Sequence, residues 1–475
     1  MNNLENVDID NLINEVEGNN SEKNNKRKKL LIVIVSCSLF VTAVITLCVV
    51  LLLLLKSPYD DGRNTPETNY YGCICDAGSS STRVSVYTWP HRKSNSIPVI
   101  TEVGRNNTKS GMHTLNDNEI KRDMELLINF CRNKIIEVSK NKSNISEANF
   151  YLKATAGMRS INVEEQNKKL NVIKKTIRES EFKFLKDDWA RVIYGSEEGM
   201  FGWITVNYLN RILFENEKAG KIKKRPYGSI DLGGYSLEIS FYTNDQIKEH
   251  RADLSLSNIN YNLYSYSFEN YGQDKFYEIL LQHLIDSQNK ANSNTIKHPC
   301  YLNGYNTSYL YKEKTYIIEG ENNFDKCQEE IKGIMKINEE KNMSMNDIYQ
   351  PSIPEDTMFY GISALYWIAN FFKLTDDKFH APNEFLILAK EYCGKKWEDV
   401  VKEYITDEEL RLKNYCISGI YIYLFLAKGF KLNETKKLII FPDKINGVEV
   451  SWTLGAMSYE IGMQPFKNAQ YYIDY

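Results

Sequence analysis

The chain has 475 residues, more than one compact core usually holds, so we expect more than one lobe. Hydrophobic residues at 42% and charged residues at 25% are ordinary for globular proteins and exclude a fibrous or wholly disordered chain. The formal net charge of -3 and the lack of a dense basic stripe exclude a nucleic-acid-binding role by composition.

The first distinctive feature along the chain is an uncharged apolar run at residues 30–55. As a helix it would reach about 39 Å, against a hydrocarbon core of about 30 Å, and it lacks a signal-peptide cleavage site. Lys and Arg crowd the residues before the run, and Asp60 and Asp61 follow it. The positive-inside rule therefore predicts a single-pass type II membrane protein. We expect residues 1–29 to be a cytosolic tail, 30–55 the transmembrane helix and 56–69 a polar stalk.

Beyond the stalk, the pattern predicts a strand at residues 71–75, a tight loop and a second strand at 83–89. A helix, a strand and another helix are expected next, at 118–139, 149–155 and 164–185. A second strand–loop–strand follows at 227–242. Helices at 274–286, 358–372, 384–391, 416–429 and 455–460 then alternate with short strands such as 438–441.

The two strand–loop–strand units resemble each other and indicate an internal duplication. The first reads strand, Asp76-Ala-Gly-Ser-Ser-Ser-Thr, strand, and the second reads strand, Asp231-Leu-Gly-Gly-Tyr-Ser, strand. The order of elements predicts an α/β protein with two lobes. We expect lobe I at residues 70–194, with 447–475 returning to it, and lobe II at 195–446.

The cysteines and sequons agree with a location outside the cytosol. No CxxC metal or redox spacing occurs, so disulfides are expected where the compartment is oxidising. Two pairs would each close a loop of moderate length, namely Cys393 with Cys416 and Cys300 with Cys327. Cys131 can reach either Cys73 or Cys75, which leaves one thiol over. Sequons that would make the protein a glycoprotein lie at Asn106, Asn141, Asn144, Asn306, Asn342 and Asn433.

A strand that ends in Asp and runs into Gly and hydroxyl residues suits a phosphate. Glycine lets the backbone turn its N–H groups toward an anion, and the hydroxyls of Ser79 and Ser80 add donors. Asp76 and Asp231 are placed to hold a divalent cation through water, since hard cations prefer oxygen ligands. A single loop of this kind can equally be an Asp-Gly hairpin turn, whereas two facing loops can clamp one polyphosphate.

Two further segments place polar groups near these loops. Glu198 stands in Gly-Ser-Glu-Glu-Gly and is a natural base for activating water, although acids at a helix start also favour the helix dipole. Thr155, in Ala-Thr-Ala-Gly-Met-Arg, offers another hydroxyl, and Arg159 offers a cation that can also be a structural ion-pair partner. The six histidines show no HxH or HExxH spacing, which argues against a zinc enzyme.

The motifs DAGSSSTR, ATAGMR, GSEEGMFGWITVNYL and DLGGYSLEISF, in this order, resemble the apyrase-conserved regions of the nucleoside triphosphate diphosphohydrolase family. The resemblance continues through YSYSFENYGQD, FYGISALYW, NYC and SWTLGAM. It implies an actin-like (RNase H-like) duplicated two-lobed fold with the active site between the lobes. It also implies hydrolysis of nucleoside tri- and diphosphates such as ATP and ADP with Ca²⁺ or Mg²⁺. Oligomers are possible.

The resemblance implies roles for individual residues by motif position. Glu198 would be the base, and Thr155 and Ser236 would position the attacking water. Phosphate would be bound by Ser79, Ser80 and the backbone of Gly233 and Gly234. Asp76, Asp231 and Glu238 would hold the metal ion through water. Tyr366 and Tyr415 would stack on the nucleobase, or else pack within helices.

Four positions depart from the family pattern. Ser81 stands where relatives often have His or Gly, and Tyr235 replaces a small residue. Glu238 replaces the usual Gln and adds negative charge near Glu198. This charge should change the metal preference or the pKa of the attacking water. Gln273 stands where relatives can have a basic residue.

Three hypotheses remain open from the sequence. The first is a surface apyrase that faces the outside of the plasma membrane, favoured by the long apolar span. The second is a Golgi-lumen nucleoside diphosphatase that acts on UDP or GDP, since the Thr-Arg ending of the first loop resembles that branch. The third is a catalytically weak nucleotide-binding protein.

Overall fold

The computed structural model describes residues 69–91, 96–288, 294–405 and 409–463, all within one compact unit, Thr68–Tyr475. The predicted cytosolic tail, transmembrane helix and stalk lie outside the described residues, apart from Asn69 at the stalk's end. Across the described ranges, no helix is both long and apolar enough to cross a membrane.

The first sheet contains five strands in the order β3-β2-β1-β4-β5. The strands are β1 (Asn69–Ala77), β2 (Thr82–Pro90), β3 (Thr101–Asn107), β4 (Asn149–Ala154) and β5 (Ala190–Val192). The first three form an antiparallel meander, and β4 and β5 run parallel to β1. Strands β1 and β4 are buried almost throughout because both faces of the sheet are covered.

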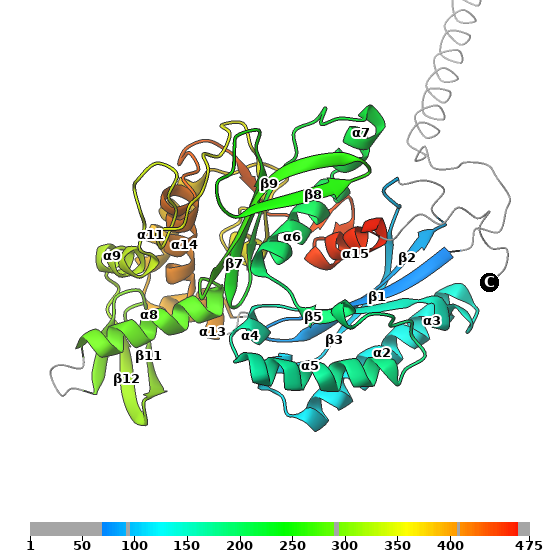
Figure 1. Ribbon diagram of the computed structural model, residues 1–475. Coiled ribbons are helices and arrows are strands. Elements are labelled where there is room, and N and C mark those ends of the chain that lie inside the picture. The colour runs from blue at the N-terminus through cyan, green and yellow to red at the C-terminus, as the bar shows by residue number, and fades with distance from the viewer. Residues whose placement is uncertain (1–68, 92–95, 289–293, 406–408, 464–475) are drawn as a thin grey trace, which may run out of the picture. The chain divides into compact units, whose positions relative to one another are not determined.

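Two long helices cover one face of this sheet, as Figure 1 shows below β1 and β3. Helix α2 (Asp117–Ser139) begins at a capping box in which Asn116 accepts from the backbone of Glu119 while the Glu119 side chain accepts from Asn116 N. The other long helix is α5 (Val163–Arg178). The short segments are η1 (Met112–Thr114), α3 (Asn144–Glu147), α4 (Ala156–Arg159) and η2 (Asp187–Trp189).

The second sheet has the order β14-β13-β6-β7-β9-β8. Its strands are β6 (Gly228–Leu232), β7 (Ser236–Tyr242), β8 (Arg251–Leu256), β9 (Ile259–Glu269), β13 (Phe359–Ser363) and β14 (Ile439–Ile440). An antiparallel meander of β6, β7 and β9 is followed by β13 and β14, which run parallel to β6. This repeats the strand order and directions of the first sheet, with β8 added at the edge.

A central helix, α6 (Gly195–Leu209), lies against the second sheet and also contacts α15 (Trp452–Met463), which reaches β1. Figure 1 shows α6 and α15 side by side between the two sheets. One core cluster joins residues from both sheets to these helices, including Ile74, Tyr151, Phe201 and Trp452. The two sheets are therefore held by a shared apolar core at the side where α6 and α15 pack.

Although Leu213 and Ile445 belong to the shared core, the remaining elements pack mostly on the separate core of the second sheet. They are α7 (Ile212–Ala219), α8 (Gln273–Gln288), β10 (Thr295–His298), β11 (Asn306–Tyr311), β12 (Lys314–Gly320), α9 (Phe324–Met335), α10 (Ala364–Phe371), α11 (Pro382–Cys393), α12 (Trp397–Glu403), α13 (Glu409–Leu412), α14 (Tyr415–Tyr423), the π-helical turn η4 (Leu424–Gly429), β15 (Lys444–Ile445) and β16 (Val448–Glu449). The predicted disulfides Cys300–Cys327 and Cys393–Cys416 are confirmed. The third pairing, expected between Cys131 and either Cys73 or Cys75, is not formed, because all three are buried free thiols.

Some predicted boundaries were wrong for identifiable reasons. Residues 358–372 are not one helix, because the apolar segment Phe359–Ser363 pairs with β6 as strand β13 before α10 begins. A short apolar run looks alike in a buried strand and a buried helix. Helix α5 ends at Arg178 rather than 185, and the last helix begins at Trp452 rather than 455. The hairpin β8–β9, most of β10–β12 and strand β3 were not predicted.

Candidate active site

The two predicted strand–loop–strand units have matching local geometry. In the first, Gly78 N donates to Ser81 O across 3.1 Å; in the second, Gly233 N donates to Ser236 O across 3.0 Å. Asp76 and Asp231 each occupy the last but one position of the strand before the loop. Both turns therefore place a carboxylate at the strand end and are closed by the N–H of a glycine two residues later.

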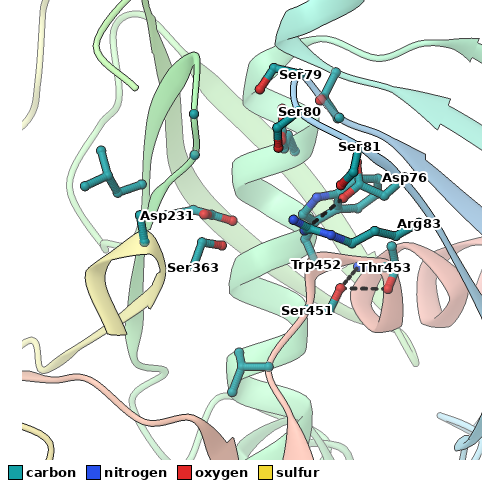
Figure 2. A pocket seen from close by; sticks show the side chains of 18 of the residues that line it. Asp76, Ser79, Ser80, Ser81, Arg83, Asp231, Ser363, Ser451, Trp452 and Thr453 are labelled. Carbon is teal, nitrogen blue, oxygen red and sulfur yellow. Dashed lines mark hydrogen bonds and ion pairs between the residues drawn. The ribbon is translucent and has the colours of Figure 1, made fainter. Parts of the chain in front are cut away.

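The two loops face each other across one cavity of about 500 Å³. A Cβ added to Gly234 in the second loop would lie 2.9 Å from Ser79 Oγ in the first, so glycine is what permits this approach. Figure 2 shows Asp76 and Asp231 on opposite sides of the cavity, with Arg83 reaching in between them. Asp76 and Asp231 therefore share one pocket, as the sequence motifs required.

Most of the predicted site residues line this cavity. They are Asp76, Ser79, Ser80, Thr155, Glu198, Asp231, Gly233, Gly234, Ser236 and Tyr366. Two predicted site residues, Glu238 and Tyr415, do not line the cavity.

The paired aspartates form a site with unbalanced negative charge. Burial raises the pKa of Asp76 to about 6; Arg83 opposes this shift and the nearby Asp231 adds to it. Burial also raises the pKa of Asp231, although a hydrogen bond from Ser363 and the charge of Arg83 lower it.

Asp76 Oδ1 is buried and has no hydrogen-bond partner. An unpartnered carboxylate oxygen beside a second carboxylate fits a divalent cation. Among the residues that the structure describes, no cluster of three or more His, Cys, Asp or Glu forms a metal centre.

Glu198 lies in the first turn of α6, on the wall of the same cavity. Its Oε2 accepts from Nη1 and Nη2 of Arg159 at 3.2 Å and 3.1 Å. Burial, and then the charge of Glu238, raise the pKa of Glu198 well above its ordinary value, while Arg159 lowers it. A buried carboxylate with a raised pKa is suited to accept a proton near neutral pH.

Glu238 was expected to help hold a metal ion, but it does not line the cavity. Its side chain is 2% exposed, and Oε1 accepts from Ser267 Oγ at 2.7 Å. The N-terminal part of α6 covers it, because a Cβ added to Gly199 would lie 3.3 Å from Glu238 Cβ. Glu238 therefore acts on the cavity through its charge, which raises the pKa of Glu198.

The aromatic wall of the cavity also differs from the expectation. Tyr366 lines the cavity together with Trp367, whose side chain is 60% exposed. Tyr415 instead belongs to the core, where its ring stacks on Phe371 with centroids 3.4 Å apart. The expected Tyr366–Tyr415 pair is thus replaced, on this wall, by Tyr366 and Trp367. Helical spacing alone could not decide which aromatic side chain faces outward.

Several cavity residues were not assigned from the sequence. They are Arg83, Arg105, Ser363, Trp367, Asp274 and Thr453. Arg83 directly follows the first loop, which was an available signal. Ser363 was hidden inside the expected helix 358–372. It has φ 61°, a left-handed conformation that is uncommon for serine and that concentrates at functional sites.

The cavity is thus lined by two facing glycine-containing loops, two aspartates and a buried glutamate. The sequence profile of the GDA1/CD39 (nucleoside phosphatase) family matches residues 63–470, and the chain belongs to this family. It is 30% identical over 427 residues to ectonucleoside triphosphate diphosphohydrolase 1 of Bos taurus, covering 82% of this chain and 81% of that protein. It is 28% identical over 413 residues to probable apyrase 3 of Arabidopsis thaliana, covering 82% of each.

A solved structure has a similar fold. The crystal structure of nucleoside triphosphate hydrolases from Neospora caninum superposes with a TM-score of 0.62 at 14% identity, covering 89% of this chain and 99% of that chain. At this level of identity the similarity concerns the fold.

Proposed function

We propose that this protein is a hydrolase that removes the terminal phosphates of nucleoside tri- and diphosphates, such as ATP and ADP, down to the monophosphate. Membership of the nucleoside phosphatase family and the names of the related diphosphohydrolase and apyrase support this activity. The observation that carries the proposal is that Asp76, Asp231 and Glu198 line one cavity between two facing loops.

In the proposed mechanism, the phosphate chain lies between the two loops. The hydroxyls of Ser79 and Ser80 donate from one side, and the backbone N–H of Gly234 donates from the other, while the N–H of Gly233 closes the turn on Ser236 O. These donors hold the terminal phosphorus in place and offset the charge that develops on its oxygens.

Glu198 accepts a proton from the attacking water in this mechanism. Arg159 binds the Oε2 atom of Glu198, which leaves Oε1 for the water. The hydroxyls of Thr155 and Ser236 line the cavity and help to orient the water. One general base of this kind contributes a rate factor of roughly 10²–10⁴.

We propose that Asp76 and Asp231 hold Ca²⁺ or Mg²⁺ through water molecules. The unpartnered oxygen of Asp76 and the mutual charge of the two aspartates support this assignment. When bound, such an ion supplies positive charge that stabilises the phosphate oxygens. The share of Glu238 in metal binding is electrostatic in this proposal, since its carboxylate lies behind the cavity wall.

For the nucleobase we propose Tyr366 and Trp367 as the stacking pair. Trp367→Ala should raise KM for nucleotides about fivefold or more, because stacking on an aromatic ring is worth roughly 1–3 kcal/mol per base. Tyr415→Leu, which removes the aromatic ring but keeps an apolar side chain, should leave KM unchanged, since the ring lies in the core. Steady-state kinetics on both variants decides between the two residues, and the opposite pattern would restore Tyr415 to the site.

We further propose an actin-like, duplicated architecture with lobes at 70–194 plus 447–475 and at 195–446. The repeated strand order of the two sheets supports it. The apolar run 30–55 supports a single-pass type II anchor, with a glycosylated catalytic part outside the cell or in the Golgi lumen. The word ectonucleoside in the name of the bovine relative favours the cell surface.

A second candidate function is a Golgi nucleoside diphosphatase that prefers UDP or GDP. Arg83 favours it, because the Thr-Arg ending that resembles this branch places a cation inside the cavity. A catalytically weak nucleotide-binding protein is the third candidate.

The test is phosphate release from ATP, ADP, UDP and GDP by the purified protein with Ca²⁺, Mg²⁺ or a chelator. We expect release from tri- and diphosphates with either ion and a loss of activity in chelator. Release from UDP and GDP alone would support the Golgi function, which surface labelling of intact cells tests separately. No release from any nucleotide, with normal nucleotide binding, would support the third candidate. Equal activity with and without chelator would contradict the metal role.

A further inference from the structure

Arg159 makes hydrogen bonds with all five of its N–H groups. Nη1 donates to Ile193 O at 3.2 Å, and Nη2 donates to Ser236 Oγ at 3.4 Å. The other hydrogens of these two nitrogens go to Glu198. The fifth group, Nε–H, donates to Glu269 Oε1 at 2.6 Å. Since the guanidinium is planar and rigid, contacts at both edges fix its plane.

The contacts at the two edges differ in kind. At the Nη edge, both donors meet the same Glu198 atom, Oε2, and no described residue donates to Oε1. At the Nε edge stands Glu269, the last residue of β9, which is paired with Ser236 of β7 in the sheet register. Glu269 is 43% exposed and Arg159 is 15% exposed. Glu269 thus holds the outer edge of Arg159 from the second sheet, whereas Arg159 itself follows β4 of the first sheet.

We propose that Glu269 is a positioning residue for hydrolysis: through Arg159, it orients Glu198 so that Oε1 remains directed at the water. This inference rests on the proposed role of Glu198 as the base. Without Glu269, Arg159 keeps its charge but loses the contact that fixes its plane. It can then turn to bind both oxygens of Glu198, so that Oε1 is no longer available to accept a proton from the water.

If the ion pair between Glu269 and Arg159 were only structural, a different result would be expected. Loss of a partly exposed ion pair changes stability slightly and affects kcat and KM only through folding. A positioning role instead lowers kcat while substrate binding is retained, because the effect lies in the orientation of the base.

The experiment compares Glu269→Ala, Glu269→Gln and Arg159→Lys in the full-length protein. Glu269→Ala should lower kcat about fivefold, the factor that one partly exposed ion pair can supply, with KM changed less than about twofold. Glu269→Gln retains an acceptor for Nε–H and should lose less. The matched control is Asp253→Ala, which removes an exposed carboxylate paired with Arg251 at 2.5 Å on strand β8. It should leave kcat unchanged, and the melting temperatures of all variants verify that they fold.

A double-mutant cycle between Glu269→Ala and Arg159→Lys completes the test. If Glu269 acts through Arg159, the double variant loses less than the product of the single losses. Unchanged kcat in Glu269→Ala, a change confined to KM, or multiplicative losses would overturn the proposal.

A crystal structure of Glu269→Ala tests the geometry independently of activity. If the wild-type protein released no phosphate, the proposed function would be refuted, but the effect of Glu269 on Arg159 could still be observed. Arg159 contacting both oxygens of Glu198 would support the positioning role, and an unmoved guanidinium would overturn it.

Discussion

The two strand–loop–strand units have the same backbone pattern and opposite charges at one matched position. In the register of β1 and β2, Asp76 lies opposite Arg83. In the register of β6 and β7, Asp231 lies opposite Glu238. Arg83 extends into the cavity with 56% of its side chain exposed, at 3.9 Å from Asp76. Glu238 is buried at 2% exposure and pairs distantly with Arg159, at 3.9 Å. The first unit therefore carries its own counter-charge, whereas the second unit adds negative charge.

This difference shows how one local motif can serve two purposes. Burial, with the charge of Asp231, raises the pKa of Glu238 to about 8, and the charge of Glu238 in turn raises the pKa of Glu198. Buried carboxyl groups with raised pKa values, which hold their protons near neutral pH, are thus concentrated beside the second loop, where the water-activating group lies. The first loop offers hydroxyl donors and Arg83. We infer that the first unit mainly binds substrate and the second mainly supports proton transfer.

The largest expected effect tests the water-activating group that lies beside the second unit. Glu198→Gln should reduce kcat by roughly 10²–10⁴-fold, because the amide keeps the shape of the side chain but cannot take a proton. Binding of a non-hydrolysable triphosphate, measured by calorimetry, should change little. Wild-type turnover in this variant would exclude Glu198 as the base.

The close approach of the two loops can be broken at one atom. A Cβ on Gly234 would lie 2.9 Å from Ser79 Oγ and 3.0 Å from Asp274 Oδ2. Gly234→Ala should displace the hydroxyl of Ser79, a proposed phosphate donor, and lower kcat/KM about tenfold, the factor that one hydrogen bond to a charged group can supply.

The control for that change is Gly333→Ala, inside helix α9, where an added Cβ meets no atom within 4 Å. It should leave kcat/KM unchanged and slightly stabilise the helix. Equal kinetics of both variants and wild type would mean that the loops need not approach each other.

The charge balance of the first unit is measurable as stability. The pKa of Asp76 is raised to about 6 from 3.8, so the folded, cation-free protein holds this proton more tightly than the unfolded chain. The Asp76 carboxylate therefore destabilises the fold above pH 6, by up to about 3 kcal/mol, and the penalty disappears as the pH falls toward 3.8.

Urea denaturation in chelator measures this penalty. Asp76→Asn should be more stable than wild type at pH 8, and the difference should shrink at pH 5. Because the free energy of unfolding of wild type is subtracted from that of the variant at each pH, the titration of other groups cancels. A variant that is less stable than wild type at pH 8 would show that Arg83 already balances Asp76.

The smallest expected effect concerns the extra carboxylate of the second unit. Because Glu238 raises the pKa of Glu198, Glu238→Gln should move the acidic limb of the kcat–pH profile to lower pH. Asp253→Asn, which removes a charge from β8, should leave the profile in place. A shift to higher pH would mean that Glu238 stabilises ionised Glu198 through an unrecognised contact.

The sequence predicted the parts of the site that depend on local chemistry. Asp76, Asp231 and the glycine turns could be recognised because a strand end, a glycine and hydroxyl residues lie within a few positions of each other. The disulfides Cys300–Cys327 and Cys393–Cys416 followed from spacing in the same way. The family motifs located Glu198 and Thr155.

The features that were missed depend on packing between distant segments. Whether Tyr415 or Trp367 faces the cavity is decided by which side of a helix meets the core, and both helices are apolar on several sides. Glu238 alternates into the cavity side of its strand by register, but α6 covers it. Strand β13 looked helical because its partner β6 is more than a hundred residues away.

The most direct test of the central claim is a crystal structure with a non-hydrolysable nucleoside triphosphate and Mg²⁺. We predict one phosphate chain that accepts hydrogen bonds from Ser79 and Ser80 on one side and from the backbone N–H of Gly234 on the other. The terminal phosphorus should lie beside a water bound to Glu198. A phosphate chain held by a single loop, or bound outside this cavity, would contradict the account.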